Sequence, residues 1–213
     1  MKKEISLLRK FEYEAISQVK IDGKILDLGG DRRSGYHELI KGEYKIEVVN
    51  INKETGADLC FDLEKVFPIT SESYEAVMCV NVLEHIFNYK NVLDESFRIL
   101  KKGGKLVGVV PFIFNVHGSP DDYFRFTRTA LKRILKEAGF ADLRVEELGT
   151  GIFSVIFQIK YGFFRFIYLR KLAMKFYIML DKILIQKIIK SLKPNNHLSE
   201  KHLPLGYFFI AKK

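Results

Sequence analysis

Short apolar runs that alternate with helical patterns are the feature of this 213-residue chain that most constrains its fold. The runs are rich in Val, Ile and Leu and are apolar on both faces, as are strands of a parallel sheet that is covered on two sides. They span residues 24–29, 44–51, 57–63, 74–81 and 104–112. This alternation predicts a doubly wound α/β fold with a mostly parallel sheet and right-handed crossovers.

Two of the helices between these runs have clear patterns. The first carries apolar and small residues at helical spacing and is predicted to end at a glycine pair. Its stripe is Leu93, Ser96, Phe97 and Leu100, and the glycines are Gly103 and Gly104. The second is predicted to begin at the N-cap residue Thr127 and to stop at Gly139.

Two further strands are predicted near the end of the chain, at residues 142–148 and 205–213, which brings the expected sheet to seven strands. The stretch between them is aromatic and basic, and a plain doubly wound domain does not need it. The predicted organisation is therefore one domain made of residues 1–150 and 204–213, with a helical insertion at residues 151–203.

The net charge of +9 is unevenly distributed. Residues 1–150 hold 23 basic and 24 acidic residues, whereas residues 151–193 hold nine basic residues and a single acid, Asp181. The basicity therefore belongs to the insertion and not to the predicted catalytic domain.

An amphipathic helical pattern runs through residues 162–193. Its polar positions are 171, 175, 182, 186 and 193, and its apolar face holds Tyr168, Leu172, Phe176, Met179, Leu180, Ile183 and Leu184. Charges interrupt the segment too often for a membrane span. It suits peripheral contact with an anionic membrane surface, while packing on the sheet and a homodimer interface remain open.

The compartment follows from the cysteines and the N-terminal pattern. Cys60 and Cys79 lie in apolar runs and are expected to be buried free thiols. Residues 1–18 carry charges among their apolar positions and lack the apolar core of a signal peptide. We therefore expect a cytoplasmic protein, with membrane association through the insertion as an open alternative.

A glycine-containing turn follows the first predicted strand, in ILDLGGDRRSGYHELI (residues 25–40). In an open α/β sheet, ligands bind beyond the carboxyl ends of the strands, beside the first strand. Glycine at that point allows positive φ and lets a ligand approach the backbone closely. The turn is therefore a candidate cofactor loop, although taken alone it also fits a structural turn.

Four stretches that follow in order between Ile25 and Phe140 carry a family resemblance. They are ILDLGG, FDLEKVFPITSESYEAVMCVNVLEHI, LDESFRILKKGGKLVGVVPF and DDYFRFTRTALKRILKEAGF. Together they resemble a class I S-adenosylmethionine-dependent methyltransferase of the type 11 methyltransferase family, and LPLGYFFIAKK resembles the last strand of the same fold. The resemblance implies a Rossmann-like methyltransferase fold, S-adenosyl-L-methionine as cofactor and S-adenosyl-L-homocysteine as product.

The resemblance also implies roles for residues at the ends of the first and third predicted strands. Asp27, Gly29 and Gly30 would line the methionine end of the cofactor, where backbone groups would bind its amino and carboxylate groups. Asp62 and Leu63 would flank the adenine, with the carboxylate accepting a hydrogen bond from the exocyclic amine.

Asn81, just after the fourth predicted strand, would contact the cofactor near its sulfonium, above a helix that Glu84 and His85 open. Two positions depart from the family pattern. Asn50 stands where an acid usually holds both ribose hydroxyls, and it is expected to pair with one of them. Asp31 replaces a glycine and is expected either to tilt the loop or to hold the ammonium of the cofactor. We expect weaker cofactor binding than in a fully matched relative.

The loop at residues 111–127 is the predicted source of substrate specificity. It concentrates His117, Asp121, Asp122, Tyr123 and Arg125. His117, Tyr123 and Arg125 are the candidate catalytic residues: His117 could act as base toward a hydroxyl, and Arg125 could bind a carboxylate or phosphate. Alternatively, Asp122 and Arg125 pair and pin the loop while His117 faces solvent. No metal ligands are predicted.

The predicted function is methyl transfer from S-adenosylmethionine to a small-molecule, glycan or lipid-linked acceptor, at oxygen. The glycan assignment, and with it polysaccharide biosynthesis, rests on the resemblance of the DDYFRFT loop alone. One alternative is a non-catalytic methyltransferase-like binding module. A nucleic-acid methyltransferase is the other, and it is not expected because no RNA-binding module or Asn-Pro-Pro-aromatic signature is present. The glycine spacing and the absence of an acid after the second predicted strand argue against a dehydrogenase.

Overall fold

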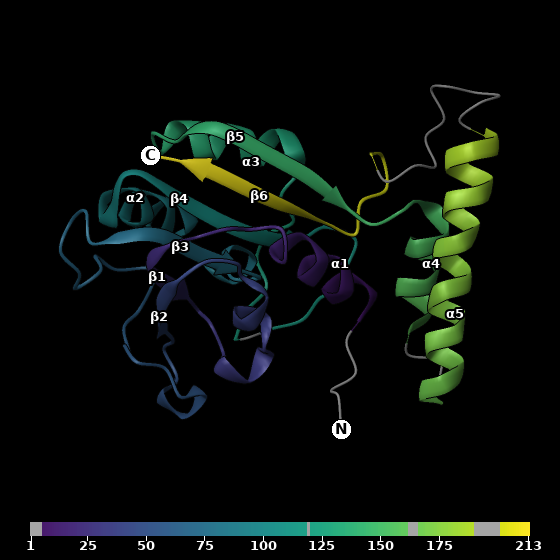
Figure 1. The fold of residues 1–213 in the computed structure, drawn as a ribbon, viewed down its shortest axis with the longest axis horizontal. Coiled ribbons are helices and arrows are strands. Elements are labelled where there is room, and N and C mark those ends of the chain that lie inside the picture. The colour runs from purple at the N-terminus through teal and green to yellow at the C-terminus, as the bar shows by residue number, and fades with distance from the viewer. Residues whose placement is uncertain (1–5, 119, 162–165, 190–200) are drawn as a thin grey trace. The chain divides into compact units, whose positions relative to one another are not determined.

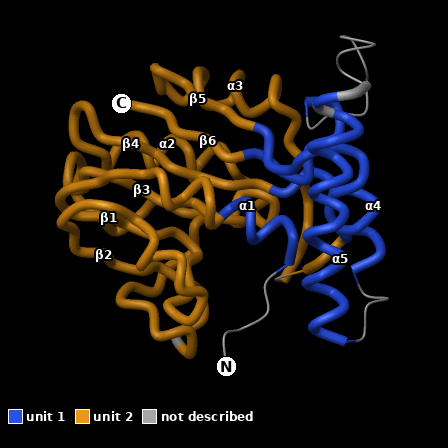
Figure 2. Tube along the Cα trace, turned by 45° about the vertical axis from the view of Figure 1, so that its right-hand side comes forward, with its two compact units in different colours: residues 1–12, 111–115, 147–207 blue, residues 13–110, 116–146, 208–213 orange. Residues whose placement is uncertain are grey.

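The structure is a computed structural model that describes residues 6–118, 120–161, 166–189 and 201–213. The chain divides into two compact units, which Figure 2 shows in different colours. Unit 1 comprises Met1–Glu12, Pro111–Asn115 and Glu147–Tyr207, and unit 2 comprises Tyr13–Val110, Val116–Glu146 and Phe208–Lys213. The predicted insertion, residues 151–203, falls within unit 1.

A six-stranded sheet has the strand order β2-β1-β3-β4-β6-β5 (Figure 1). Its strands are β1 (Gly23–Leu28), β2 (Tyr44–Val49), β3 (Tyr74–Val80), β4 (Leu100–Pro111), β5 (Ala141–Leu148) and β6 (Gly206–Lys212). The first four strands are parallel. β6 is antiparallel to β4, because Lys213 N donates to Gly104 O (3.0 Å) while Phe112 N donates to Leu205 O (2.8 Å). This doubly wound, mostly parallel sheet confirms the predicted fold class.

The neighbouring strands β1 and β3 form much of the core of unit 2. The side chains of Ile25, Leu26 and Leu28 in β1 have no exposed surface, and neither do those of residues 76–79 in β3. Burial on both faces of the sheet explains why these strands are continuous apolar runs and not alternating ones. The same arrangement brings the carboxyl ends of β1, β2 and β3 to one edge of the sheet.

Helices α2 (Tyr89–Ile99) and α3 (Arg128–Glu137) lie side by side, since Phe97 at the end of α2 meets Phe140 after α3 with ring centroids 5.2 Å apart. The predicted N-cap of α3 is confirmed: Thr127 accepts a hydrogen bond from Ala130 N (3.2 Å). α2, by contrast, ends at Ile99, so the prediction that a glycine pair ends it is wrong. That pair lies inside β4, which begins at Leu100.

Residues 57–63, predicted as a strand, form only an isolated parallel bridge from Leu59 to Val49. The side chain of Asp58 accepts the hydrogen bond of Val48 N (2.8 Å), and a side-chain bond of this kind replaces part of a strand ladder. The sheet therefore has six strands and not seven. Because the segment does not enter the sheet, Cys60 is exposed, contrary to expectation, while Cys79 in β3 is a buried free thiol as predicted.

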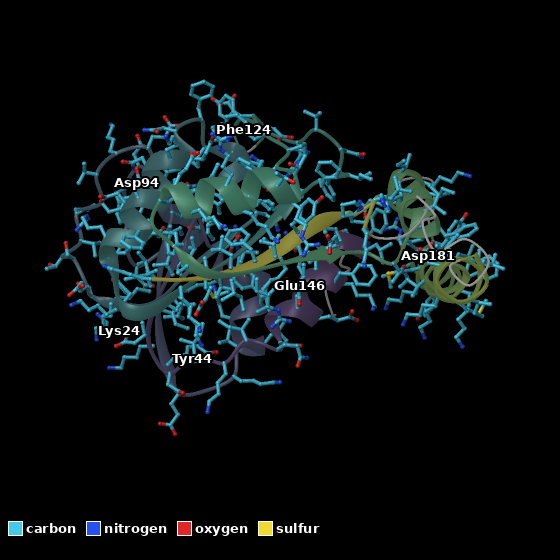
Figure 3. All side chains as sticks on the ribbon, turned by 90° about the horizontal axis from the view of Figure 1, so that it is seen from above. Lys24, Tyr44, Asp94, Phe124, Glu146 and Asp181 are labelled. Atoms are coloured by element: carbon cyan, nitrogen blue, oxygen red, sulfur yellow. The ribbon has the colours of Figure 1, made fainter. Side chains whose placement is uncertain are left out.

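Unit 1 contains α4 (Ile152–Lys160) and α5 (Ile167–Leu180), which lie side by side, followed by a π-helical segment at Asp181–Ile189. Residues 162–165 and 190–193 of the predicted amphipathic segment lie outside the described residues. Asp181, labelled in Figure 3, is completely buried and bonds to Phe153 N (2.9 Å) and Ser154 N (2.8 Å) at the start of α4.

The first half of α1 (Leu7–Ile16) belongs to unit 1 and the second half to unit 2. Among the described helices, none has the length and apolar character needed to cross a membrane.

Candidate active site

A cavity of about 750 Å³ opens in unit 2 at the carboxyl ends of three strands. Gly29 follows β1, Asn50 follows β2 and Asn81 follows β3, and all three line the cavity. This is the edge at which ligands bind in open α/β sheets, and the volume lies within the usual range for small-molecule sites. The cavity is therefore the candidate active site.

The glycine loop shapes one wall of this cavity. Gly29 has φ +66, and a Cβ placed there would lie 2.7 Å from Cγ2 of Val82. A Cβ on Gly30 would lie 2.0 Å from Oδ2 of Asp27. Both positions therefore require glycine, but only Gly29 is on the cavity wall, whereas Gly30 packs behind it.

Asp27 lies beneath the glycine loop with no exposed surface. The Tyr36 hydroxyl donates to its Oδ2 (2.5 Å), and Nε2 of His37 is 2.7 Å from the same oxygen. Burial raises the pKa of the Asp27 carboxyl, and the hydrogen bonds from His37 and Tyr36 oppose that rise. The carboxylate thus holds the helical turn Tyr36–Leu39 against β1 and does not reach the cavity wall. Contact between the backbone at this end of β1 and a cofactor stays a prediction.

Asp31 and Arg33 are paired beside the cavity and both line it. The Asp31 carboxylate accepts from Arg33 N (2.8 Å), which caps the helical turn Arg32–Ser34, and from the Arg33 guanidinium (2.7 Å). Asp31, which replaces a glycine of the family pattern, therefore caps a local turn, and Arg33 balances its charge. Arg33 was not among the predicted site residues, although its position two residues after Asp31 in the sequence could have indicated it.

Asn50 uses its side chain to hold the glycine loop. Its Nδ2 donates to Gly30 O (3.0 Å) and is 3.4 Å from Gly29 O, and its Oδ1 accepts from Asn52 N (3.0 Å). A carboxamide oxygen has two lone pairs, so the second remains chemically able to accept from a ribose hydroxyl. The predicted pairing with the ribose stays a prediction.

Asp62, Leu63 and Asn81 line the same cavity, and their contacts with the adenine and the sulfonium stay predictions. Asp62 Oδ1 accepts from Glu64 N (2.9 Å). Asn81 adopts φ +54, a left-handed conformation that asparagine tolerates better than most residues. Its backbone N donates to Val109 O (2.9 Å), which joins the end of β3 to β4.

The loop after β4 closes over the turn Leu83–His85. Tyr123 N donates to Glu84 O (2.8 Å), and Nδ1 of His85 is 2.5 Å from Asp121 O. Tyr123, Asp121 and His85 line the cavity. His117 is not on the cavity wall itself, but its ring packs edge-on against that of His85 at 4.9 Å.

Arg125 forms a two-pronged ion pair with Asp122, whose side chain is only 3% exposed. The two bonds are 2.5 Å to Oδ1 and 2.7 Å to Oδ2, and Asp122 Oδ2 also accepts from His117 N (2.8 Å). The Arg125 guanidinium holds the pKa of the Asp122 carboxyl well below its usual range. Arg125 does not line the cavity. This geometry matches the alternative in which the pair pins the loop.

Comparisons with known proteins agree with this architecture. A family profile described as a methyltransferase domain matches residues 34–108. An uncharacterised protein of Methanocaldococcus jannaschii is 34% identical over 113 residues, which cover 50% of this chain and 47% of that protein. The chain thus aligns with about half of that relative's length.

Two solved structures share the fold. An S-adenosylmethionine-dependent methyltransferase from Archaeoglobus fulgidus is 17% identical with a TM-score of 0.55, covering 97% of this chain and 91% of that one. Phosphoethanolamine N-methyltransferase 2 of Haemonchus contortus, solved with S-adenosyl-L-methionine, is 18% identical with a TM-score of 0.55, covering 95% and 52%. The chain therefore has the fold of these S-adenosylmethionine-dependent methyltransferases, and its residues 34–108 match the profile of a methyltransferase domain.

Proposed function

We propose that this chain transfers a methyl group from S-adenosylmethionine to a hydroxyl oxygen of a small-molecule, glycan or lipid-linked acceptor. The observation that carries the proposal is the cavity at the carboxyl ends of β1, β2 and β3, lined by Gly29, Asp62 and Asn81 together. These residues come from three separate segments, and for each of them the family resemblance implies a cofactor contact.

The cavity wall offers groups that suit the two ends of the cofactor. Gly29, which cannot carry a Cβ without meeting Val82, leaves room for close backbone approach. Backbone groups of the glycine loop would bind the amino and carboxylate groups of the methionine, and Asp62 would accept from the adenine amine. When bound, S-adenosylmethionine supplies an electrophilic methyl group on a sulfonium.

On the acceptor side, the residues of this chain orient two groups in line and exclude water, which is most of what such a transfer needs. Tyr123 and Asp121 line the cavity from the loop after β4. We propose His117 as the base for a hydroxyl and Tyr123 as an acceptor contact. Arg125 is proposed as a positioning residue, because its guanidinium is committed to Asp122.

The test is calorimetric titration of the whole chain with S-adenosylmethionine and, separately, with S-adenosylhomocysteine. Asp62→Ala should weaken both by about 10-fold or more, since a hydrogen bond to a charged group is worth about 1.5–3 kcal/mol. Glu146→Ala is the matched control, because this half-exposed acid pairs with Arg144 in β5 away from the cavity. Wild-type protein that binds neither ligand at millimolar concentration would overturn the cofactor assignment and favour a non-catalytic module.

The acceptor is tested by transfer of labelled methyl groups to polysaccharides, lipid-linked glycans and small hydroxyl compounds. A labelled product that survives mild base and acid as a methyl ether supports oxygen as the methylated atom. A labelled amine would overturn it, and the name of the Haemonchus contortus relative makes phosphoethanolamine an appropriate probe. Transfer to RNA or DNA would favour the nucleic-acid alternative.

A second proposal concerns the location of this activity: α5 and the π-helical segment after it dock on an anionic membrane surface. Several apolar side chains of α5 are exposed, with Tyr168 83%, Leu172 66% and Phe176 50% accessible, whereas Ile185 in the π-helical segment is buried. At these three residues of α5 the predicted apolar face therefore does not pack into the core. Exposed Lys171 and Lys175 lie in the same helix, and their charge complements anionic headgroups.

Vesicle sedimentation tests this docking. The chain should sediment with vesicles of 30% phosphatidylglycerol in phosphatidylcholine, remain in solution with phosphatidylcholine alone, and lose binding in Lys171→Glu/Lys175→Glu. Lys132→Glu/Lys136→Glu on α3 carries the same charge change in unit 2 and should still bind. A stable dimer by light scattering that fails to bind vesicles would contradict the proposal and identify the face as a homodimer interface.

A further inference from the structure

Three side chains that the proposed function leaves partly unused converge at the edge of the cavity. Glu84, His85 and His117 each offer one ligand atom, and these atoms all lie within 4.8 Å of one another. Glu84 and His85 come from the turn after β3, while His117 comes from the loop after β4, so the fold joins residues 32 positions apart. A set of two imidazoles and one carboxylate is a common donor set for divalent transition metals.

Burial makes this cluster unlike an ordinary surface group. Glu84 has no exposed surface, the His85 side chain is 11% exposed and that of His117 is 37% exposed. The Glu84 Oε1 and His85 Nε2 atoms are 3.7 Å apart, which is beyond hydrogen-bond range. A carboxylate oxygen held beside an imidazole nitrogen in this way can serve as a ligand of a metal ion.

The hydrogen bond of His85 orients its ring as a metal ligand requires. Nδ1 of His85 is 2.5 Å from the carbonyl oxygen of Asp121, and a carbonyl can only accept. Nδ1 therefore carries the proton, which leaves the lone pair on Nε2, the atom nearer Glu84. A carbonyl partner of this kind fixes the tautomer of a ligating histidine. The His117 loop is held by its backbone N, which donates to Asp122 Oδ2 (2.8 Å).

We propose that Glu84, His85 and His117 form a binding site for a divalent transition-metal ion, and that the ion binds the hydroxyl acceptor of the proposed methyl transfer. Around one ion with ligand distances of about 2.0–2.2 Å, no two ligand atoms can be more than about 4.4 Å apart. The 4.8 Å within which the three ligand atoms lie is only a few tenths of an ångström more than this, a difference that a small side-chain rotation removes. Three protein ligands leave open positions for an acceptor oxygen.

The role of the ion in catalysis rests on the proposed methyl transfer, whereas the metal site itself does not depend on it. An ion lowers the pKa of a bound hydroxyl and supplies an oxygen nucleophile at neutral pH. The acceptor O–H loses its proton to solvent, its oxygen bonds to the methyl carbon, and the carbon–sulfur bond breaks with its electron pair remaining on sulfur. His117 then acts as a ligand and not as the base. His85 lines the same cavity as Asn81, which sets the ion beside the predicted cofactor.

Metal binding is measured without cofactor or acceptor, by equilibrium dialysis of tag-free, chelator-treated protein against Co²⁺, Mn²⁺ or Zn²⁺. We expect one tightly bound ion per chain for at least one metal, and a visible absorption band for Co²⁺. Loss of an outer partner costs about 10–100-fold in metal affinity, so Glu84→Gln and His117→Ala should each cost at least that. His202→Ala removes an exposed histidine from unit 1 and should leave the affinity unchanged.

Circular dichroism and the Tm of each variant show whether it folds. If His117→Ala does not fold, Glu84→Gln still tests the site, because it keeps the volume of the side chain. Stoichiometry below 0.2 ions per chain for all three metals, or variants that bind as wild type does, would overturn the site. Calorimetric titration with S-adenosylhomocysteine separates the two proposals: cofactor binding without metal binding leaves the proposed function standing, and metal binding without cofactor binding leaves only the site.

Discussion

Asn50 was predicted to pair with a ribose hydroxyl, and in the structure its side chain also holds the glycine loop. Its Nδ2 donates to Gly30 O, so Asn50→Asp would lose this bond and direct a carboxylate at two carbonyl oxygens. We expect the free energy of unfolding to fall by about 1 kcal/mol, measured by urea denaturation. Glu146→Ala is again the control, and an Asn50→Asp variant as stable as wild type would show that the amide does not support the loop.

Glu95 makes a pH-dependent contribution to stability. Its carboxylate accepts from Arg98 (2.7 and 2.9 Å) and from Phe67 N (2.7 Å), and the Arg98 hydrogen bond lowers its pKa. Because the folded pKa is lower than the unfolded value of about 4.3, the stabilisation is present above that value and is lost as pH falls through the folded pKa.

Glu95→Gln should therefore lower the free energy of unfolding by about 1–3 kcal/mol at pH 7 and by much less at pH 3. Denaturation at both pH values measures the difference. The exposed ion pair of Glu137 with Arg133 provides the comparison, because Glu137→Gln should change stability little at either pH. An equal loss for Glu95→Gln at both pH values would contradict the role of its charge.

At the scale of elements, Asp181 caps α4 from 27 residues or more along the chain. Its Oδ1 accepts from Phe153 N, and its Oδ2 from the N and Oγ of Ser154 and from Thr150 Oγ1. Asp181→Ala leaves these donors buried without their acceptor and should destabilise unit 1 by about 2–4 kcal/mol. Hydrogen exchange of the α4 amides should accelerate, while that of β1 and β3 should not.

Lys182→Ala provides the control for this prediction, because Lys182 is exposed and adjacent to Asp181. Uniform acceleration of exchange over the whole chain would show that α4 is not a separately stabilised element. Unchanged exchange in α4 would show that the cap is not what stabilises it.

At the scale of the whole molecule, ligand binding should stabilise the fold, because the cavity joins segments distant in sequence. S-adenosylhomocysteine at about 100 times its Kd should add about 2.7 kcal/mol to the free energy of unfolding. Gly29→Ala should abolish this gain, because its Cβ meets Val82 at the cavity wall. Gly35→Ala is the matched control: Gly35 also has positive φ (+76), but a Cβ there meets nothing within 4 Å. Equal gains in both variants would contradict the cavity as the cofactor site.

Features that depend only on short stretches of the chain could be predicted from the sequence. The strands β1 and β3, the α3 cap at Thr127 and the glycine turn after β1 were predicted because burial on both faces, capping and positive φ depend on short stretches of chain. The same holds for the acidic Asp62 segment on the cavity wall, which the family resemblance located.

Tertiary structure decided what depends on partners distant in sequence. The sequence did not indicate that the Asp27 carboxylate bonds to Tyr36 and His37. It also did not indicate that Asp58 replaces a ladder bond, so that residues 57–63, predicted as a strand, stay outside the sheet. The metal-binding geometry proposed for Glu84 and His117 could not be read from sequence either, since no periodicity relates them. The physical reason is the same in each case: hydrogen bonds and charge pairs form with whichever group packing brings near, and packing is set by the fold as a whole.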